Sequence, residues 1–166
     1  NSKTVSMTVK AKRDDVFGFL AEVENLPLWA KDYCKAVSIE GDRTVIDTPM
    51  GRHFLVYDAD EASGAIDMMA GASFEKMDTF PVRVHCLPEG YTSASFTFFQ
   101  KEEVPDAMFE GQFASLVKEV TDLAERFGGG QILATQAEKR LYTGLVSKDL
   151  KATKAFYSDY FGFEAV

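Results

Sequence analysis

One long amphipathic stretch constrains the fold of this chain more than any other feature. Between residues 105 and 127 apolar side chains recur at alternating intervals of four and three, over about six helical turns. They are Phe109, Phe113, Leu116, Val120, Leu123 and Phe127. Pro105 and Asp106 stand at first-turn positions, and glycines follow at 128–130. The pattern predicts one long helix with an apolar stripe that faces a core.

The residues before this helix predict mainly antiparallel strands. Residues 4–11 alternate strictly between apolar and polar side chains. The period then becomes helical, first over about 14–23 and then briefly around Pro27. From about 33 to 103, turns that contain Gly or Pro separate short β-type runs, of which 91–99 is the clearest. This spacing is typical of an antiparallel meander.

Composition limits the class of partner. The chain has 166 residues, of which 46% are hydrophobic and 27% charged, close to the average of globular domains. Acidic residues exceed basic ones by 26 to 18, so nucleic acid and anionic membranes are disfavoured. No run approaches the roughly 18 apolar residues of a membrane span. Cys34 and Cys86 lack metal-type spacing. We therefore expect a cytoplasmic protein with free thiols, no metal, no cofactor and no membrane insertion.

The order of strand, helix pair, six-strand meander and long C-terminal helix resembles the START/Bet v 1-like superfamily, in particular its polyketide cyclase/dehydrase-type (SRPBCC) branch. The resemblance is carried by residues 5–11, 15–20, 24–29, 91–99 and 105–127. The stretch Glu-Asn-Leu-Pro-Leu-Trp at 24–29 is similar to the family's D-x-E-x-x-P-x-W segment, with Glu22 in place of the usual Asp. The resemblance covers residues about 4–127. It implies an α+β helix-grip fold, in which a curved antiparallel seven-stranded sheet surrounds the long helix.

The resemblance also implies an apolar cavity between sheet and helix, which relatives use for lipids, sterols, polyketides and other apolar molecules. The 14 Phe and 6 Tyr provide more ring surface than a small core needs. The ligand-binding candidates are Trp29, Met69, Phe96, Phe98 and Phe113, each of which core packing would also explain. We expect the protein to bind a small hydrophobic or aromatic molecule, lipid- or polyketide-like.

A second hypothesis is an enzyme of aromatase/cyclase type that uses Arg83, His85 and Asp67. Arg83 and His85 share one strand face, and the turn that follows decides which face this is. A three-residue loop at 88–90, built as a type I turn with Gly in the left-handed position, directs both side chains to solvent. A two-residue Glu-Gly turn would direct them inward, where Arg83 would orient an oxyanion and His85 would act as a general base. We favour the first register. Asp67 is either a buried acid, a partner of Arg83 or an exposed carboxylate.

The C-terminal part predicts a separate module. Leu-Tyr-Thr-Gly-Leu-Val-Ser-Lys-Asp-Leu, followed by Ala-Phe-Tyr-Ser-Asp-Tyr-Phe-Gly-Phe, resembles the opening of a vicinal-oxygen-chelate (glyoxalase/bleomycin-resistance) domain over about 140–166. Metal-binding members carry a His in the first strand, where this chain has Tyr142. We therefore expect no metal ligand from that strand.

These assignments divide the chain into three parts. Residues 1–127 are the helix-grip domain, 128–140 a Gly-rich linker, and 141–166 an incomplete βα(β) tail. A third hypothesis follows: the chain is the N-terminal module of a longer two-domain protein that continues past Val166. We also expect 131–166 to pack on the helix-grip domain or on a second copy of the chain, which would form a homodimer.

Overall fold

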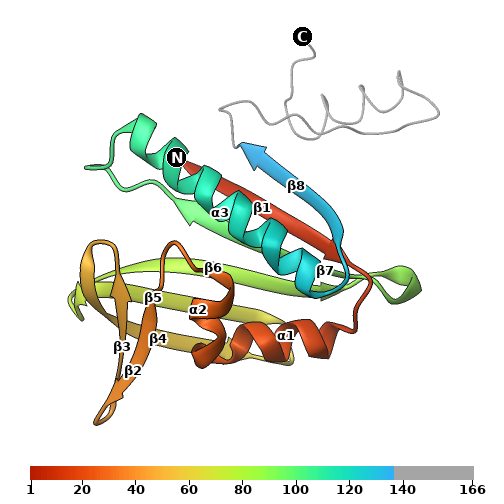
Figure 1. The fold of residues 1–166 in the computed structure, drawn as a ribbon, viewed down its shortest axis with the longest axis horizontal. Coiled ribbons are helices and arrows are strands. Elements are labelled where there is room, and N and C mark those ends of the chain that lie inside the picture. Colours follow the sequence, from red (N-terminus) through yellow and green to blue (C-terminus); the bar gives the residue numbers. More distant parts are fainter. Residues whose placement is uncertain (137–166) are drawn as a thin grey trace, which may run out of the picture.

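The computed structural model describes residues 1–136, which form one antiparallel sheet with helices against one of its faces (Figure 1). The strands are β1 (Ser2–Val9), β2 (Ala36–Glu40), β3 (Arg43–Thr48), β4 (Gly51–Asp60), β5 (Ala65–Ser73), β6 (Lys76–Cys86), β7 (Thr92–Phe99) and β8 (Gly130–Gln136). The helices are α1 (Arg13–Ala21), α2 (Leu26–Trp29) and α3 (Asp106–Arg126). Short 3₁₀ turns lie at Val23–Asn25 and Pro88–Gly90. The predicted helix-grip class is confirmed.

The long helix α3 follows its predicted bounds closely. Pro105 precedes its first turn, and the carbonyl of Pro105 accepts hydrogen bonds from the backbone N–H groups of Met108 and Phe109. In Figure 1, α3 runs along β1, while α1 and α2 lie against another part of the same face. The ring of Phe19 on α1 meets that of Phe127 edge-on, with centroids 5.9 Å apart. The helices therefore form one layer over the inner face of the sheet.

The sheet has one strand more than the seven predicted, because residues 130–136 form β8 instead of a linker. Its order is β2-β3-β4-β5-β6-β7-β1-β8. Gly128 and Gly129 have φ of +91° and +83°, which turns the chain back after α3. Gly130 then passes so close to β1 that a Cβ there would lie 2.3 Å from the carbonyl oxygen of Thr8. The glycines thus make a tight turn and a close backbone approach. Residues 141–166 lie outside the described part of the chain, so their separate module stays a prediction.

The register between β6 and β7 is the favoured one. Val82 pairs with Phe96 and Val84 with Ala94, and all four side chains are buried on the inner face. The connecting turn differs in detail from the predicted type I form, because Glu89 as well as Gly90 has a positive φ, +61°. Only the length of the loop decides the register, so this difference leaves the pairing unchanged.

Candidate ligand site under the long helix

A cluster of three rings occupies the inner face of the sheet. The centroids of Trp29 and Phe96 are 5.4 Å apart, and those of Phe96 and Phe80 are 6.4 Å apart. Phe96 is fully buried, and Trp29 is 3% exposed. Phe80 is only partly buried. The sequence predicted Trp29 and Phe96 as lining residues, and the structure brings them together with Phe80, which was not singled out.

Helix α3 fixes the segment that carries Trp29. Pro27 lies in the first turn of α2, which ends at Trp29. In the loop that follows, the backbone N–H of Asp32 donates to Oε1 of Glu119 at 2.7 Å. The hydroxyl of Ser115 donates to Oδ2 of Asp32 at 2.6 Å. Two residues of α3 therefore hold this loop.

The indole N–H of Trp29 is not satisfied by the protein. Among the buried side-chain nitrogen and oxygen atoms in the described part of the chain, Nε1 of Trp29 alone has no hydrogen-bond partner. Most buried polar groups in proteins are paired. Leaving one unpaired costs about 1–3 kcal/mol. The cluster thus holds one polar donor on an otherwise apolar wall.

A second ring cluster lies under α3 beside the first strand. Phe98 and Phe109 stack with centroids 5.3 Å apart. The amine of Lys3 lies 5.7 Å from the centroid of Phe109 and 5.1 Å from that of Phe113, and forms an ion pair with Glu110. Lys3 is 6% exposed and is a site residue that the sequence reasoning missed. Lys3 has the same strand parity as the buried Val5, Met7 and Val9, and it pairs with Phe98. This parity could have predicted its burial.

The prediction for Met69 is wrong, because Met69 lies on the outer face of the sheet. In β5 the buried side chains are those of Ile66, Met68 and Ala70, which alternate toward the helices. Met68 pairs with Phe80 and is the inward methionine. Because the two adjacent methionines are equally hydrophobic, the sequence does not show which of them faces the helices. The register of the strand determines this.

Arg83, His85 and Asp67 also lie on the outer face. Nη1 of Arg83 donates to Oδ1 of Asp67 at 2.7 Å, and both side chains are more than a third exposed. His85 is exposed and pairs with Ser93. The structure therefore makes Asp67 the partner of Arg83 and directs these side chains away from the ring clusters. Inward catalytic roles for Arg83 and His85 are not supported.

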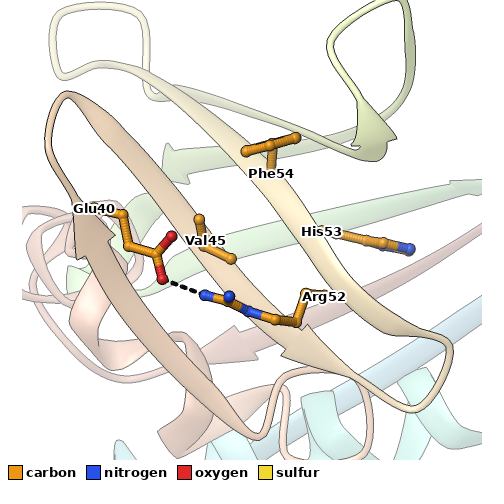
Figure 2. Close-up of a pocket in the computed structure, with 5 residues that line it drawn as sticks. All are labelled: Glu40, Val45, Arg52, His53 and Phe54. Carbon is orange, nitrogen blue, oxygen red and sulfur yellow. Dashed lines mark hydrogen bonds and ion pairs between the residues drawn. The ribbon is translucent and has the colours of Figure 1, made fainter.

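A small pocket lies over β2, β3 and β4. It is lined by Glu40, Val45, Arg52, His53 and Phe54. Figure 2 shows Arg52 reaching toward Glu40, with which it forms an ion pair. The volume is about 110 Å³. Small-molecule sites usually have at least about 300 Å³. This pocket is therefore a poor candidate for a ligand site.

Glu119 on α3 is a buried carboxyl group. It is 7% exposed, and burial raises its pKa above the ordinary value of 4.5. Hydrogen bonds from the backbone N–H groups of Asp32 and Tyr33 act in the opposite direction. Glu119 is therefore buried because the loop at 30–35 needs a hydrogen-bond acceptor, not because its side chain is hydrophobic. A helical wheel does not show such a need.

The raised pKa of Glu119 predicts a pH-dependent stability. A carboxyl group whose pKa is raised on folding contributes stability while it is protonated, and this contribution is lost as the pH rises through the folded pKa. We expect Glu119→Gln to gain stability relative to the wild type as the pH rises from about 4 to about 8. The Gln oxygen still accepts the hydrogen bond from Asp32. Urea unfolding of both proteins across this range is the measurement.

The matched control for Glu119→Gln is Asp122→Asn, one turn further along the exposed side of α3. It removes one carboxylate from the exposed surface of the same helix and so measures the effect of lost surface charge alone. A difference between Glu119→Gln and the wild type that stays constant with pH would contradict the assignment.

Comparison with solved structures supports the fold. A START superfamily protein from Mycobacterium smegmatis matches with a TM-score of 0.58 at 14% identity, over 77% of this chain and 98% of that one. The Aha1 dimer from Colwellia psychrerythraea matches with a TM-score of 0.55 at 15% identity, over 78% and 99%. The chain has a START-like helix-grip fold. An HSP90 activator from Plasmodium falciparum shares this fold, with a TM-score of 0.54 at 9% identity over 80% and 99%.

Comparison of the sequence, unlike comparison of the structure, finds no match. No sequence model of a known family matches the chain, and no curated protein sequence matches it. The glyoxalase-like resemblance of residues about 140–166 lies outside the described residues and stays a prediction. Within residues 1–136, no group of three or more His, Cys, Asp or Glu residues is placed to hold a metal ion. No helix in that part is long and apolar enough to cross a bilayer.

Proposed function

We propose that the protein binds a small hydrophobic or aromatic molecule between the sheet and α3. The observation that carries this proposal is the gathering of rings from α2, β6, β7 and α3 on one face of the sheet. They are Trp29, Phe80, Phe96, Phe98, Phe109 and Phe113. Ring faces in such a cluster offer a flat apolar ligand large contact areas and favourable stacked or edge-on geometries.

Accessibility supports the same proposal. Phe80 and Phe98 are only partly buried, whereas Phe96 on the same inner face is fully buried. Ring surface therefore continues from the solvent to the interior of the molecule. In the proposed binding mode, a small apolar molecule enters at these partly exposed rings.

The two other hypotheses receive less support. A cyclase that uses Arg83, His85 and Asp67 would need these groups beside the ligand, and they lie on the opposite face of the sheet. The two-domain hypothesis concerns residues 141–166, outside the described part of the chain. Binding without catalysis by these three residues is the simpler proposal.

The proposed function predicts that Phe98→Ala weakens the binding of an apolar probe about tenfold, because one stacked ring face is worth about 1 kcal/mol or slightly more. N-phenyl-1-naphthylamine is a suitable neutral probe, since its fluorescence rises in apolar surroundings. Trp29 is the single tryptophan of the chain, so energy transfer from Trp29 to the bound probe reports its proximity. The measurement is a fluorescence titration of both proteins.

Phe99→Ala is the matched control, since Phe99 follows Phe98 on β7 and is 50% exposed. Its affinity for the probe should equal that of the wild type. Circular dichroism of each variant verifies the fold. Absence of probe binding to the wild type, or equal losses in the two variants, would refute binding at the ring clusters.

Two further features of the proposal concern where the protein works and with what. We propose a cytoplasmic location, supported by two free thiols. Cys34 is buried, which raises its pKa to about 11 and keeps the thiol unreactive. The predicted homodimer through residues 131–166 concerns a segment that lies mostly outside the described residues, and it stays a prediction.

A further inference from the structure

We propose that the indole N–H of Trp29 is the polar anchor of the ligand site, and that the site selects neutral apolar molecules that carry an acceptor oxygen, such as a ketone, ester or ether. This inference rests on the proposed function and deepens it. The site then discriminates against plain hydrocarbons of the same shape.

Other polar side chains packed around the core have partners. The hydroxyl of Thr92 donates to the carbonyl of Ala11 at 2.7 Å. The hydroxyl of Tyr57 donates to the carbonyl of Leu20. Glu119 accepts from Asp32. Nε1 of Trp29 is the exception among the buried side-chain polar atoms described.

Trp29 cannot easily turn to find an acceptor within the protein. Its ring packs on Phe96 at an interplanar angle of 50°. Its backbone is held at the end of α2, where the N–H of Ala30 donates to the carbonyl of Leu26 at 2.9 Å. An indole nitrogen is a donor only, so a partner has to supply a lone pair. The neighbouring rings of Phe96 and Phe80 carry no such atom.

The apolar surroundings of Trp29 favour an acceptor without charge. A neutral oxygen satisfies the N–H without bringing an ion into an apolar interior, where an unpaired charge is costly. The carboxyl group of Glu119 on α3 accepts from the backbone N–H of Asp32, in the loop directly after Trp29, and would repel an anion there. A ketone, ester or ether oxygen therefore fits the site better than a carboxylate.

The test uses two probes of equal shape that differ in one atom pair. Benzophenone has a C=O group where 1,1-diphenylethylene has C=CH₂. Their dissociation constants are measured by displacement of N-phenyl-1-naphthylamine from the wild type and from Trp29→Phe, which keeps a ring but lacks the N–H. We expect the wild type to bind the ketone about tenfold more tightly than the alkene. In Trp29→Phe the two affinities should become equal.

A second measurement avoids reliance on the variant. Because the chain has one tryptophan, its ¹H–¹⁵N spectrum contains one indole cross-peak. This peak should move downfield when benzophenone binds and should not do so with 1,1-diphenylethylene. An indole peak that stays in place while the ketone binds would overturn the inference.

The outcomes separate this inference from the proposed function. Equal affinities of the wild type for both probes would overturn the inference and leave apolar binding intact. A preference for the ketone that persists in Trp29→Phe would also overturn it, since the anchor would be another group. If neither probe displaces the dye while the dye itself binds at the ring clusters, the inference about Trp29 fails and the proposed apolar binding stands. If the dye does not bind either, the proposed function fails as well.

Discussion

Replacing Phe96 with alanine is expected to lower the free energy of unfolding by about 3–5 kcal/mol, the usual cost of removing a buried ring. Phe96 is completely buried and contacts the rings of both Trp29 and Phe80. Its removal leaves a cavity that β7 cannot close, because β7 is paired on both sides with β6 and β1. Urea unfolding followed by far-ultraviolet circular dichroism measures the loss.

Trp29 provides a local measure of the same change. Loss of the Phe96 ring removes one wall beside the indole, so the fluorescence of Trp29 in the folded variant should move to longer wavelength as water approaches. Phe99→Ala on the same strand is the control, because Phe99 is 50% exposed. It should cost no more than about 0.5 kcal/mol and leave the emission unchanged. Similar losses in the two variants would mean that Phe96 does not occupy the core.

Gly64→Ala is expected to be the most damaging glycine substitution among those described, with a loss of more than about 3 kcal/mol. Gly64 has φ of +75°, and a Cβ on it would lie 2.2 Å from the carbonyl oxygen of Val84. That neighbour is backbone in the middle of the sheet, whose N–H donates to the carbonyl of Gly64 at 2.9 Å. Relief of the clash would require β6 to move away from the turn.

Gly41→Ala separates the two causes of this loss. Gly41 has a similar φ of +67°, but nothing lies within 4 Å of a Cβ built on it. It should therefore lose only the conformational cost of about 1–2 kcal/mol. The difference between the two variants in urea unfolding measures the clash. If both lose the same amount, the close approach of Gly64 to Val84 is wrong.

The elements that the sequence predicted well are those in which local pattern and tertiary environment agree. The apolar stripe of 105–127 appears as α3 at Asp106–Arg126 because every fourth or third residue meets the sheet. The length of the loop at 88–90 was enough to set the register of β6 and β7. Trp29 and Phe96 were predicted as ligand-binding candidates, and both are buried with their rings in contact.

The errors arise where a residue's role depends on a distant partner. Met69 faces outward because the register of β5 gives the inner position to Met68. Gly130 was assigned to a Gly-rich linker, whereas it lies in a strand that passes close to Thr8. The local sequence contains no pattern that predicts this contact. In each case the deciding contact lies far away along the chain.

The position of β1 has a consequence for the order in which the molecule can assemble during synthesis. β1 is made before the other described strands, yet its partners are β7 and β8, so Ser2 pairs with Phe99 and Val9 with Gly130. The strands from β2 to β7 can pair with their neighbours as they emerge, whereas β1 has to wait for the end of the meander. Such non-local pairing slows folding, because a long loop must close before any contact compensates for the lost entropy. Completion of the sheet therefore coincides with the covering of its aromatic face by α3, and the nascent chain has no finished ring clusters before that moment.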